Sequence, residues 1–134
     1  MSAPFVVANL AKTFTMHLQG GIPLPVVEGV SFALEVGRCA VLGGPSGAGK
    51  SSILKMVYGN YAVDNGSIIV THRGVPVDIA TASPRTVLRV RRDVIGYVSQ
   101  FLRVVPRVSA LDVVAEPLVS RGETSDVARE RAGQ

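Results

Sequence analysis

The eight residues from Gly44 to Ser51 constrain the fold of this chain more than any other feature. They read Gly-Pro-Ser-Gly-Ala-Gly-Lys-Ser and fit the pattern G-x-x-x-x-G-K-[ST] without a gap. A short apolar run, 39–42, precedes them, and apolar side chains at helical spacing follow from Ile53 to Tyr58. The pattern therefore predicts a buried strand, a tight loop and a helix, an arrangement that turns backbone N–H groups toward a phosphate.

Each residue type in this loop has a chemical reason. Gly44, Gly47 and Gly49 let the backbone adopt conformations that a Cβ forbids, so that successive N–H groups can converge on an anion. Lys50 supplies a compact positive charge for the β- and γ-phosphates, and the Ser51 hydroxyl is the expected Mg²⁺ ligand. We predict a nucleoside triphosphate site here. Its binding residues are Gly44, Pro45, Ser46, Gly47, Ala48, Gly49, Lys50, Ser51 and Ser52.

Two residues outside the loop extend the predicted site. Gln100 follows a strand-like segment, 95–99, and a glutamine at the end of a core strand can reach the metal and the attacking water. Phe14 lies near the end of the first predicted strand, where an aromatic ring can stack on an adenine base. An exposed loop glutamine and a core phenylalanine are the ordinary alternatives.

The rest of the pattern predicts a mixed α/β chain. We expect strands over 5–10, 30–36, 39–42 and 94–98, a loop over 19–25, and a hairpin of 67–71 with 75–79. We expect helices that begin at Ser83-Pro84 and run to about Arg92, at Ser109 in a capping box with Asp112, and at Thr124. Pro117 should break or kink the second of them.

Composition limits the class of protein. With 134 residues, 47% apolar and 18% charged, the chain is long enough for one domain with a buried core and is not a disordered tail. Its single cysteine, Cys39, excludes a disulfide framework and a cysteine-based zinc finger, and we expect this side chain to be a small buried one. Because no apolar run spans a bilayer and the N-terminus lacks the basic start of a signal peptide, we expect a cytoplasmic protein.

The positive charge of the chain is local. Six arginines and one acid, Asp93, lie between residues 85 and 107, a balance of +5 against +4 for the whole chain. Such a stripe suits an acidic partner, whereas a solvated helix face and loop is the plainer interpretation. Only 5% of the residues are aromatic, so there is little to stack on bases, and we do not expect nucleic acid to bind.

Together these residues resemble the ABC-type ATP-binding subunits. Phe14, the Gly44–Ser51 loop and Gln100 occur in the order and rough spacing of the A-loop, Walker A and Q-loop of that family, and the resemblance covers essentially the whole chain. It implies an α/β fold, the P-loop NTPase fold of an ABC-type nucleotide-binding domain with an antiparallel β subdomain. It also implies ATP and Mg²⁺ as cofactors, Ser51 and Gln100 on the metal, and a dimer partner that is a second copy or a paralogous subunit.

Within the family, several stretches resemble the PhnL subunits of bacterial phosphonate (carbon–phosphorus lyase) utilisation. The most specific is 98–111, and shorter ones are 11–15, 24–27 and 58–61. This resemblance implies a part in ribose 1-methylphosphonate 5-triphosphate synthesis, with soluble carbon–phosphorus lyase components as partners. Two alternatives stay open. One is an ATP-binding subunit that energises a membrane ABC transporter and is held at the inner membrane by a permease. The other is a non-hydrolysing nucleotide-binding or interaction module.

Other motifs of the family are missing from the sequence. It contains no signature Ser-Gly-Gly, no Walker B Asp-Glu and no late switch histidine, since His17 and His72 come too early. Asp112 lies only 12 residues after Gln100 and behind a helix cap, so we reject it as the Walker B acid. We therefore expect 1–134 to be the N-terminal part of a single ABC-type domain, truncated inside the helical subdomain. We expect no catalytic residue in it and negligible hydrolysis, with ATP hydrolysis belonging to the full-length protein.

Overall fold

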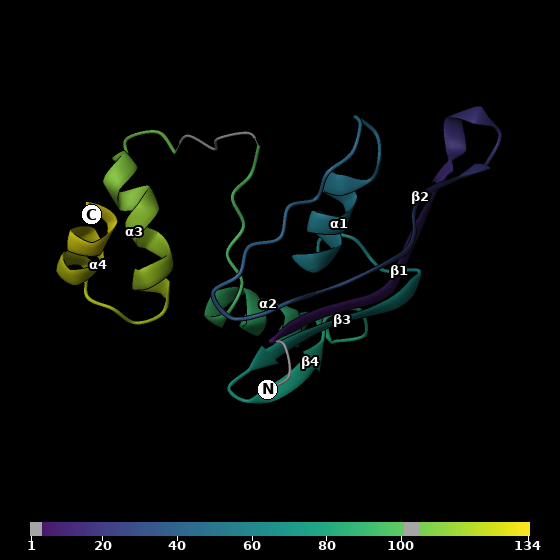
Figure 1. The fold of residues 1–134 in the computed structure, drawn as a ribbon. Helices are drawn as coiled ribbons and strands as arrows, with labels where there is room; N and C mark the ends of the chain where they lie inside the picture. Colours follow the sequence, from purple (N-terminus) through teal and green to yellow (C-terminus); the bar gives the residue numbers. More distant parts are fainter. Residues whose placement is uncertain (1–3, 101–104) are drawn as a thin grey trace. The chain divides into compact units, whose positions relative to one another are not determined.

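The computed structural model describes residues 4–100 and 105–134, which divide into two compact units, Met1–Val87 and Leu88–Gln134 (Figure 1). The first unit contains β1 (Phe5–Met16), η1 (His17–Gln19), β2 (Ile22–Leu34), α1 (Lys50–Val57), β3 (Asn65–His72) and β4 (Val75–Asp78). The second contains α3 (Ala110–Ser120) and α4 (Ser125–Ala132), and α2 (Pro84–Asp93) spans the boundary.

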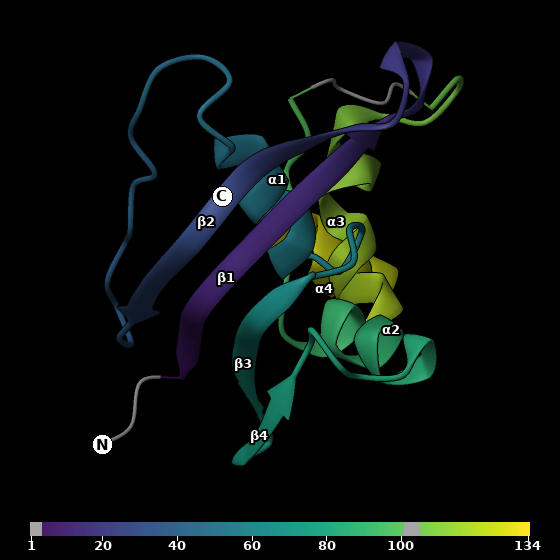
Figure 2. The same cartoon turned by 90° about the vertical axis from the view of Figure 1, so that its right-hand side faces the viewer.

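The first unit is built on a four-stranded antiparallel sheet in the order β2-β1-β3-β4 (Figure 2). β1 and β2 form a long hairpin that turns at η1 and at Gly20 and Gly21, both with φ of 78°. The predicted loop over 19–25 is wrong beyond this turn, because β2 already begins at Ile22 and includes Pro23 and Pro25. Prolines are tolerated there because β2 is an edge strand, where a missing N–H need not remove a ladder bond.

The core of the first unit consists of apolar side chains from the sheet and from α1. Helix α1 lies against the β1–β2 side of the sheet (Figure 2). The apolar side chains that are at most 6% exposed in this unit are Val7, Leu10, Val27, Ile53, Met56, Ile68, Val70 and Ile79. Burial of these groups, at about 25 cal/mol per Å² of apolar surface, is what holds the helix after the loop against the sheet.

The predicted hairpin in the middle of the chain is confirmed. In the ladder between β3 and β4, Ile69 pairs with Asp78 at one end and His72 pairs with Val75 at the other. The two residues between the strands, Arg73 and Gly74, have φ of 53° and 78°. Two consecutive positive φ values are the conformation of a type I′ turn, which matches the twist of the flanking strands.

Two predicted strands are wrong. Neither 39–42 nor 94–98 is a strand in the part of the chain that the structure describes. The second run begins with a turn in which the N–H groups of Val94 and Ile95 donate to the carbonyl of Val90, and Val41 and Val98 are 88% and 91% exposed. An apolar run forms a strand only when a neighbouring strand satisfies its backbone groups, and among the described residues neither run joins the sheet. Cys39, expected to be buried, is exposed for the same reason.

An apolar pocket of about 270 Å³ lies next to the unpaired segment 39–42. One wall consists of Phe5, Phe32 and Leu34 from β1 and β2, and the other of Ile53, Leu54 and Val57 from α1. The edge of the pocket includes Arg38, Cys39, Ala40 and Leu42. The side chains predicted to form a buried strand therefore border an open apolar surface.

The helix caps read from the sequence are confirmed. The Ser83 hydroxyl accepts a hydrogen bond from the backbone N–H of Thr86 (3.3 Å) before α2, and the Ser109 hydroxyl accepts one from the N–H of Asp112 (3.2 Å) before α3. Pro117 does not break α3, which continues to Ser120. α3 and α4 pack together, with Ala115 and Ala128 buried. Within the described residues, no helix is both long and apolar enough for a transmembrane span.

Candidate nucleotide-binding site

The glycine-rich loop has the backbone conformations that its sequence predicts. Gly44, Gly47 and Gly49 have φ of 139°, 81° and 88°, all in the region that favours glycine, and Gly49 is the N-cap of α1. The loop closes on itself through a hydrogen bond from the N–H of Ala48 to the carbonyl of Pro45 (3.2 Å). The chain thus turns sharply into the helix with its backbone exposed around the turn.

Gly49 is fixed by a close approach to strand β2. A Cβ at this position would lie 2.4 Å from the carbonyl oxygen of Val26 and 3.1 Å from a methyl group of Val27. The ladder has a register shift at the same place: Lys12 pairs with Val27 and Thr13 with Pro25, so Val26 is an extra residue in β2. The phosphate loop therefore rests on an irregularity of the sheet that only a glycine can approach.

Lys50 lies folded back over the loop. Its ammonium donates to the carbonyl oxygens of Gly44 (2.7 Å) and Pro45 (2.6 Å). An ammonium has three donors, so two are used within the loop and one is left for a ligand. The positive charge is held at the mouth of the loop, where an arriving phosphate would compete with the two carbonyls for it.

The first turn of α1 also suits an anion. It contains no acidic residue, and the first N–H groups of a helix have no partner inside the helix. Ser51 is exposed there and Ser52 is half-buried. The described residues contain no cluster of three His, Cys, Asp or Glu side chains, so a divalent ion at Ser51 would take most of its ligands from phosphate oxygens and water, as Mg²⁺ commonly does.

Phe14 reaches the same region from strand β1. Its partner across the hairpin is Leu24, two residues from Val26, on which Gly49 rests. The ring is half-buried and meets the Tyr61 ring edge to face, with centroids 5.4 Å apart and planes at 77°. The sheet thus brings the predicted base-stacking residue and the predicted phosphate loop to one side of the hairpin.

Gln100 is the second predicted site residue outside the loop. It belongs to the second unit, it is exposed, and the segment before it is not a strand. Its predicted role as a metal ligand stays a prediction. The neighbouring segment 101–104, which carries much of the resemblance to the phosphonate subfamily, lies outside the described residues.

Asp64 also belongs to this region, although the sequence does not indicate it, because Asp64-Asn65-Gly66 is typical only of a turn. One carboxylate oxygen accepts a hydrogen bond from the backbone N–H of Thr13 (2.7 Å), and the other accepts one from the ammonium of Lys12 (3.1 Å). These bonds hold the pKa of Asp64 below its usual range, with the larger contribution from the Thr13 N–H and the smaller one from Lys12. Asp64 lies 52 positions after Lys12 and 51 positions after Thr13, and no local sequence pattern connects residues so far apart.

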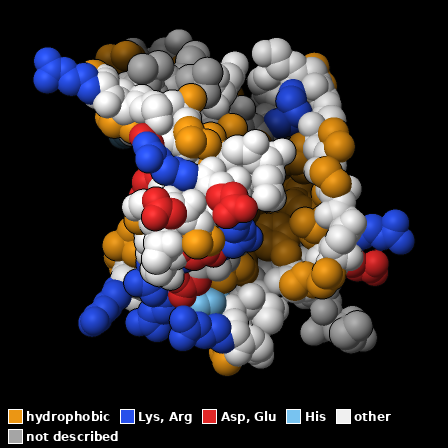
Figure 3. Space-filling model, turned by 90° about the vertical axis from the view of Figure 1, so that its left-hand side faces the viewer, with side chains coloured by type: hydrophobic (Ala, Val, Ile, Leu, Met, Phe, Trp, Pro, Cys, Tyr) orange, Lys and Arg blue, Asp and Glu red, His pale blue; other side chains and the backbone are white. Residues whose placement is uncertain are grey.

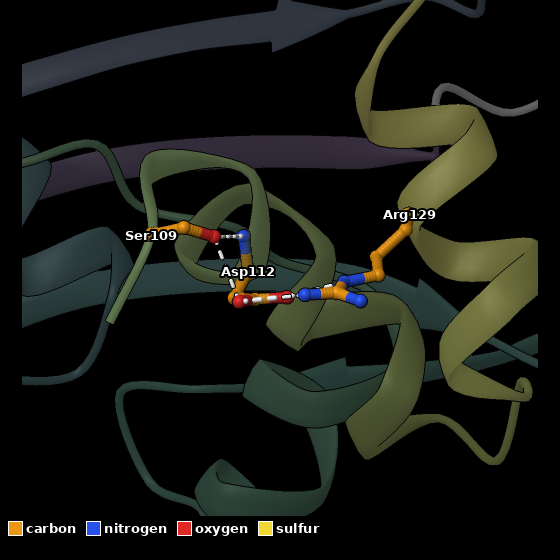
Figure 4. A network of polar contacts seen from close by, with 3 residues as sticks. All are labelled: Ser109, Asp112 and Arg129. Carbon is orange, nitrogen blue, oxygen red and sulfur yellow. Dashed lines mark hydrogen bonds and ion pairs between the residues drawn. The ribbon is translucent and has the colours of Figure 1, made fainter. Parts of the chain in front are cut away.

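The Asp112 carboxylate lies in a network of polar contacts with Ser109 and Arg129 (Figure 4), and its rejection as a Walker B acid stays a prediction. Its carboxylate receives two hydrogen bonds from the guanidinium of Arg129, at 2.6 and 3.1 Å, and one from the Ser109 hydroxyl at 2.7 Å. The Arg129 bonds, and then the Ser109 bond, lower the pKa of Asp112. The Ser109 hydroxyl thus caps α3, and the ion pair between Asp112 and Arg129 joins α3 to α4.

The arginine stripe includes one face of α2. Arg85, Arg89 and Arg92 lie four and three residues apart, which places them on one side of the helix, and all three are exposed. Lys and Arg side chains gather toward the lower edge of the face drawn in Figure 3. The exposure of the three arginines agrees with a solvated helix face.

The chain belongs to the ABC transporter family, whose sequence profile matches residues 27–134. It is 32% identical over 136 residues to the lipoprotein-releasing system ATP-binding protein LolD of Novosphingobium aromaticivorans, covering 100% of this chain and 57% of that protein. It is 33% identical over 105 residues to the cell division ATP-binding protein FtsE of Bacillus subtilis, covering 78% of this chain and 44% of that protein. The chain thus spans about half the length of the curated relatives that it matches.

The solved structures it resembles confirm the predicted fold. The dimeric ATP-binding cassette MJ0796 in a post-hydrolysis state with ADP and Pi matches with a TM-score of 0.77 and 24% identity, over 96% of this chain and 53% of that chain. A second dimeric structure of MJ0796 gives a TM-score of 0.79. The fold is that of an ABC ATPase cassette, a P-loop NTPase with an antiparallel sheet.

Proposed function

We propose that this chain binds ATP as part of an ABC-type subunit that energises a membrane transporter. The observation that carries the proposal is the loop itself: three glycines at positive φ, the N-terminus of α1, and the Lys50 ammonium held over the loop. The relatives LolD and FtsE are both named ATP-binding proteins, and LolD is named for a lipoprotein-releasing system. Membrane association would then come through a permease partner.

Different groups of the loop would bind different parts of the triphosphate. The backbone N–H groups of 44–51 would surround the phosphate oxygens, and the Lys50 ammonium would leave its two carbonyl partners for the β- and γ-phosphates. A bound Mg²⁺ would neutralise charge that develops on the phosphates. The Ser51 hydroxyl and Gln100 are the residues that we propose for it, and Phe14 is the residue that we propose for adenine stacking.

Hydrolysis needs more than these residues supply. We place no catalytic residue in 1–134, and we propose a dimer partner, a second copy or a paralogous subunit, as in the dimeric cassette that the chain resembles. Within this chain the site would bind and orient the nucleotide, and the turnover would belong to the full-length dimer.

The phosphonate assignment is the second candidate. The observation that favours it is the stretch 98–111, which resembles PhnL, whereas the names of the relatives favour a transporter. Affinity purification of the tagged protein from membranes solubilised in mild detergent separates the two. Recovery of a permease supports the transporter, and recovery of soluble carbon–phosphorus lyase components without a permease supports the phosphonate role.

The loop assignment is tested by replacing Lys50. Lys50→Ala removes the charge that the phosphates require, and we expect Mg-ATP affinity to fall by at least roughly 100-fold in isothermal titration calorimetry, about 3 kcal/mol. Arg85→Ala is the matched control, because it removes an exposed positive charge outside the loop. Equal ATP affinity in wild type and Lys50→Ala would refute the phosphate-loop assignment.

A further inference from the structure

The segment 58–64, which joins α1 to β3, is anchored at both of its ends. Near its start the N–H groups of Asn60 and Tyr61 donate to the carbonyl of Lys55 in α1, at 2.8 and 3.3 Å. At its end the N–H of Asp64 donates to the carbonyl of Ala11 in β1 (3.2 Å). The segment therefore connects the helix that follows the phosphate loop with the strand that carries Phe14.

Tyr61 occupies the middle of this segment and makes contacts on two sides. Its ring lies edge to face with Phe14, at 5.4 Å between centroids. Its hydroxyl is 3.2 Å from the ammonium of Lys55, which donates to it from α1. Aromatic pairs in this arrangement are stabilised beyond the area they bury, so the Tyr61 ring restricts the orientation of the Phe14 ring.

A second contact restrains Phe14: Lys12 of β1 lies over its ring, and Asp64 at the end of the segment 58–64 pairs with Lys12. The ammonium of Lys12 lies 5.3 Å from the centroid of the Phe14 ring, and Asp64 holds that ammonium at 3.1 Å. The Lys12 side chain is only 13% exposed, so it is packed in place and does not move freely in solvent. The Phe14 ring is therefore restrained by a cation over the ring as well as by Tyr61.

We propose that Tyr61 is a positioning residue for the base of the nucleotide, acting through Phe14, with the Lys12–Asp64 pair as a second support. This inference rests on the proposed role of Phe14 in adenine stacking. Tyr61 touches Phe14 and contacts α1, so it relates the stacking ring to the helix that begins at the phosphate loop. A ring already oriented before the ligand arrives loses less conformational freedom on binding.

The test compares a ligand that has a base with one that has none. Mg-ATP and magnesium tripolyphosphate are titrated into the full natural chain by calorimetry. We expect Tyr61→Ala to weaken ATP binding roughly 3- to 10-fold and to leave tripolyphosphate binding unchanged. Tyr61→Phe keeps the ring and should restore ATP affinity. Thr15→Ala, which changes the exposed neighbour of Phe14 on β1, is the control and should bind both ligands as wild type does.

The outcomes separate this inference from the function on which it rests. The inference applies if Phe14→Ala weakens ATP binding and leaves tripolyphosphate binding unchanged. In that case, unchanged ATP affinity in Tyr61→Ala overturns the inference, and so does an equal loss of affinity for ATP and tripolyphosphate. If Phe14→Ala has no effect on ATP, the stacking role itself is wrong. In the Phe14→Ala background, Tyr61→Ala should cause no further selective loss. Tyr61→Leu, which keeps apolar volume, replaces Tyr61→Ala if the latter does not fold, and it should show the same selective loss.

Discussion

The close approach of Gly49 to β2 leads to a prediction about two glycines of the same loop. Gly49 and Gly47 have similar backbone conformations, with φ of 88° and 81°. A Cβ at Gly49 would lie 2.4 Å from the Val26 carbonyl oxygen, whereas a Cβ at Gly47 meets no described atom within 4 Å. Gly47→Ala and Gly49→Ala therefore share the cost of a left-handed backbone, and only Gly49→Ala adds a steric clash.

The expected magnitudes follow from these two contributions. A residue with a Cβ in the left-handed region costs about 1–2 kcal/mol, which is the whole effect expected for Gly47→Ala. Overpacking against a backbone atom that cannot move away adds about 1–3 kcal/mol, so we expect Gly49→Ala to lose about 2–5 kcal/mol of unfolding free energy. Gly49→Ala should also weaken ATP binding, because the loop has to move off the sheet to make room for the methyl group.

Urea unfolding followed by circular dichroism measures both variants against wild type, with ATP affinity measured in parallel. The slope of free energy against urea should be the same in all three proteins, so that midpoints can be compared directly. An equal loss in Gly47→Ala and Gly49→Ala would refute the reasoning, since it would mean that the loop does not rest on Val26.

Two further predictions concern the Asp64 carboxylate and the Ser109 helix cap. Because the pKa of folded Asp64 lies below its ordinary value of 3.8, its bonds to Thr13 and Lys12 stabilise the fold fully above that value and are lost as the pH falls through the lower folded pKa. Asp64→Asn should therefore lower stability at neutral pH and flatten the acid limb of unfolding free energy against pH; an unchanged acid limb contradicts this. Ser109→Ala should cost about 1 kcal/mol and speed amide hydrogen exchange in the first turn of α3, whereas Ser109→Thr keeps the hydroxyl and most of the protection. Equal exchange in the two variants would mean that the hydroxyl does not cap the helix.

Features that depend on local rules could be predicted from the sequence. The conformations of Gly44, Gly47 and Gly49 follow from one motif, and the caps at Ser83 and Ser109 follow from side chains that bond three residues ahead. The turn at 73–74 follows from the separation of two apolar runs. Each of these needs only residues close in the chain to form its hydrogen bonds, so a single sequence contains enough information.

Features that depend on distant partners could not be predicted in the same way. The run 39–42 has the composition of a buried strand, but composition does not show whether a neighbouring strand lies beside it, and here Val41 is 88% exposed. Asp64 looks like an ordinary turn residue until β1 places the Thr13 N–H within 2.7 Å of it. Tyr61 stands out in the sequence only as part of the stretch 58–61, and it gains its proposed role only from its contact with Phe14.

The β1–β2 hairpin relates the two ends of the proposed nucleotide site to each other. Gly49 rests on Val26 of β2, and Phe14 lies on β1 opposite Leu24, so the offset between phosphate loop and stacking ring is set by the register of one pair of strands. A slip of two residues would keep every side chain on its own face of the sheet and still move Phe14 by roughly 7 Å along the strand. The register shift at Val26 therefore determines which carbonyl the loop rests on. It also determines how far along the hairpin the Phe14 ring lies from that carbonyl. For this reason the irregularity in the hairpin belongs to the proposed site as much as the glycines do.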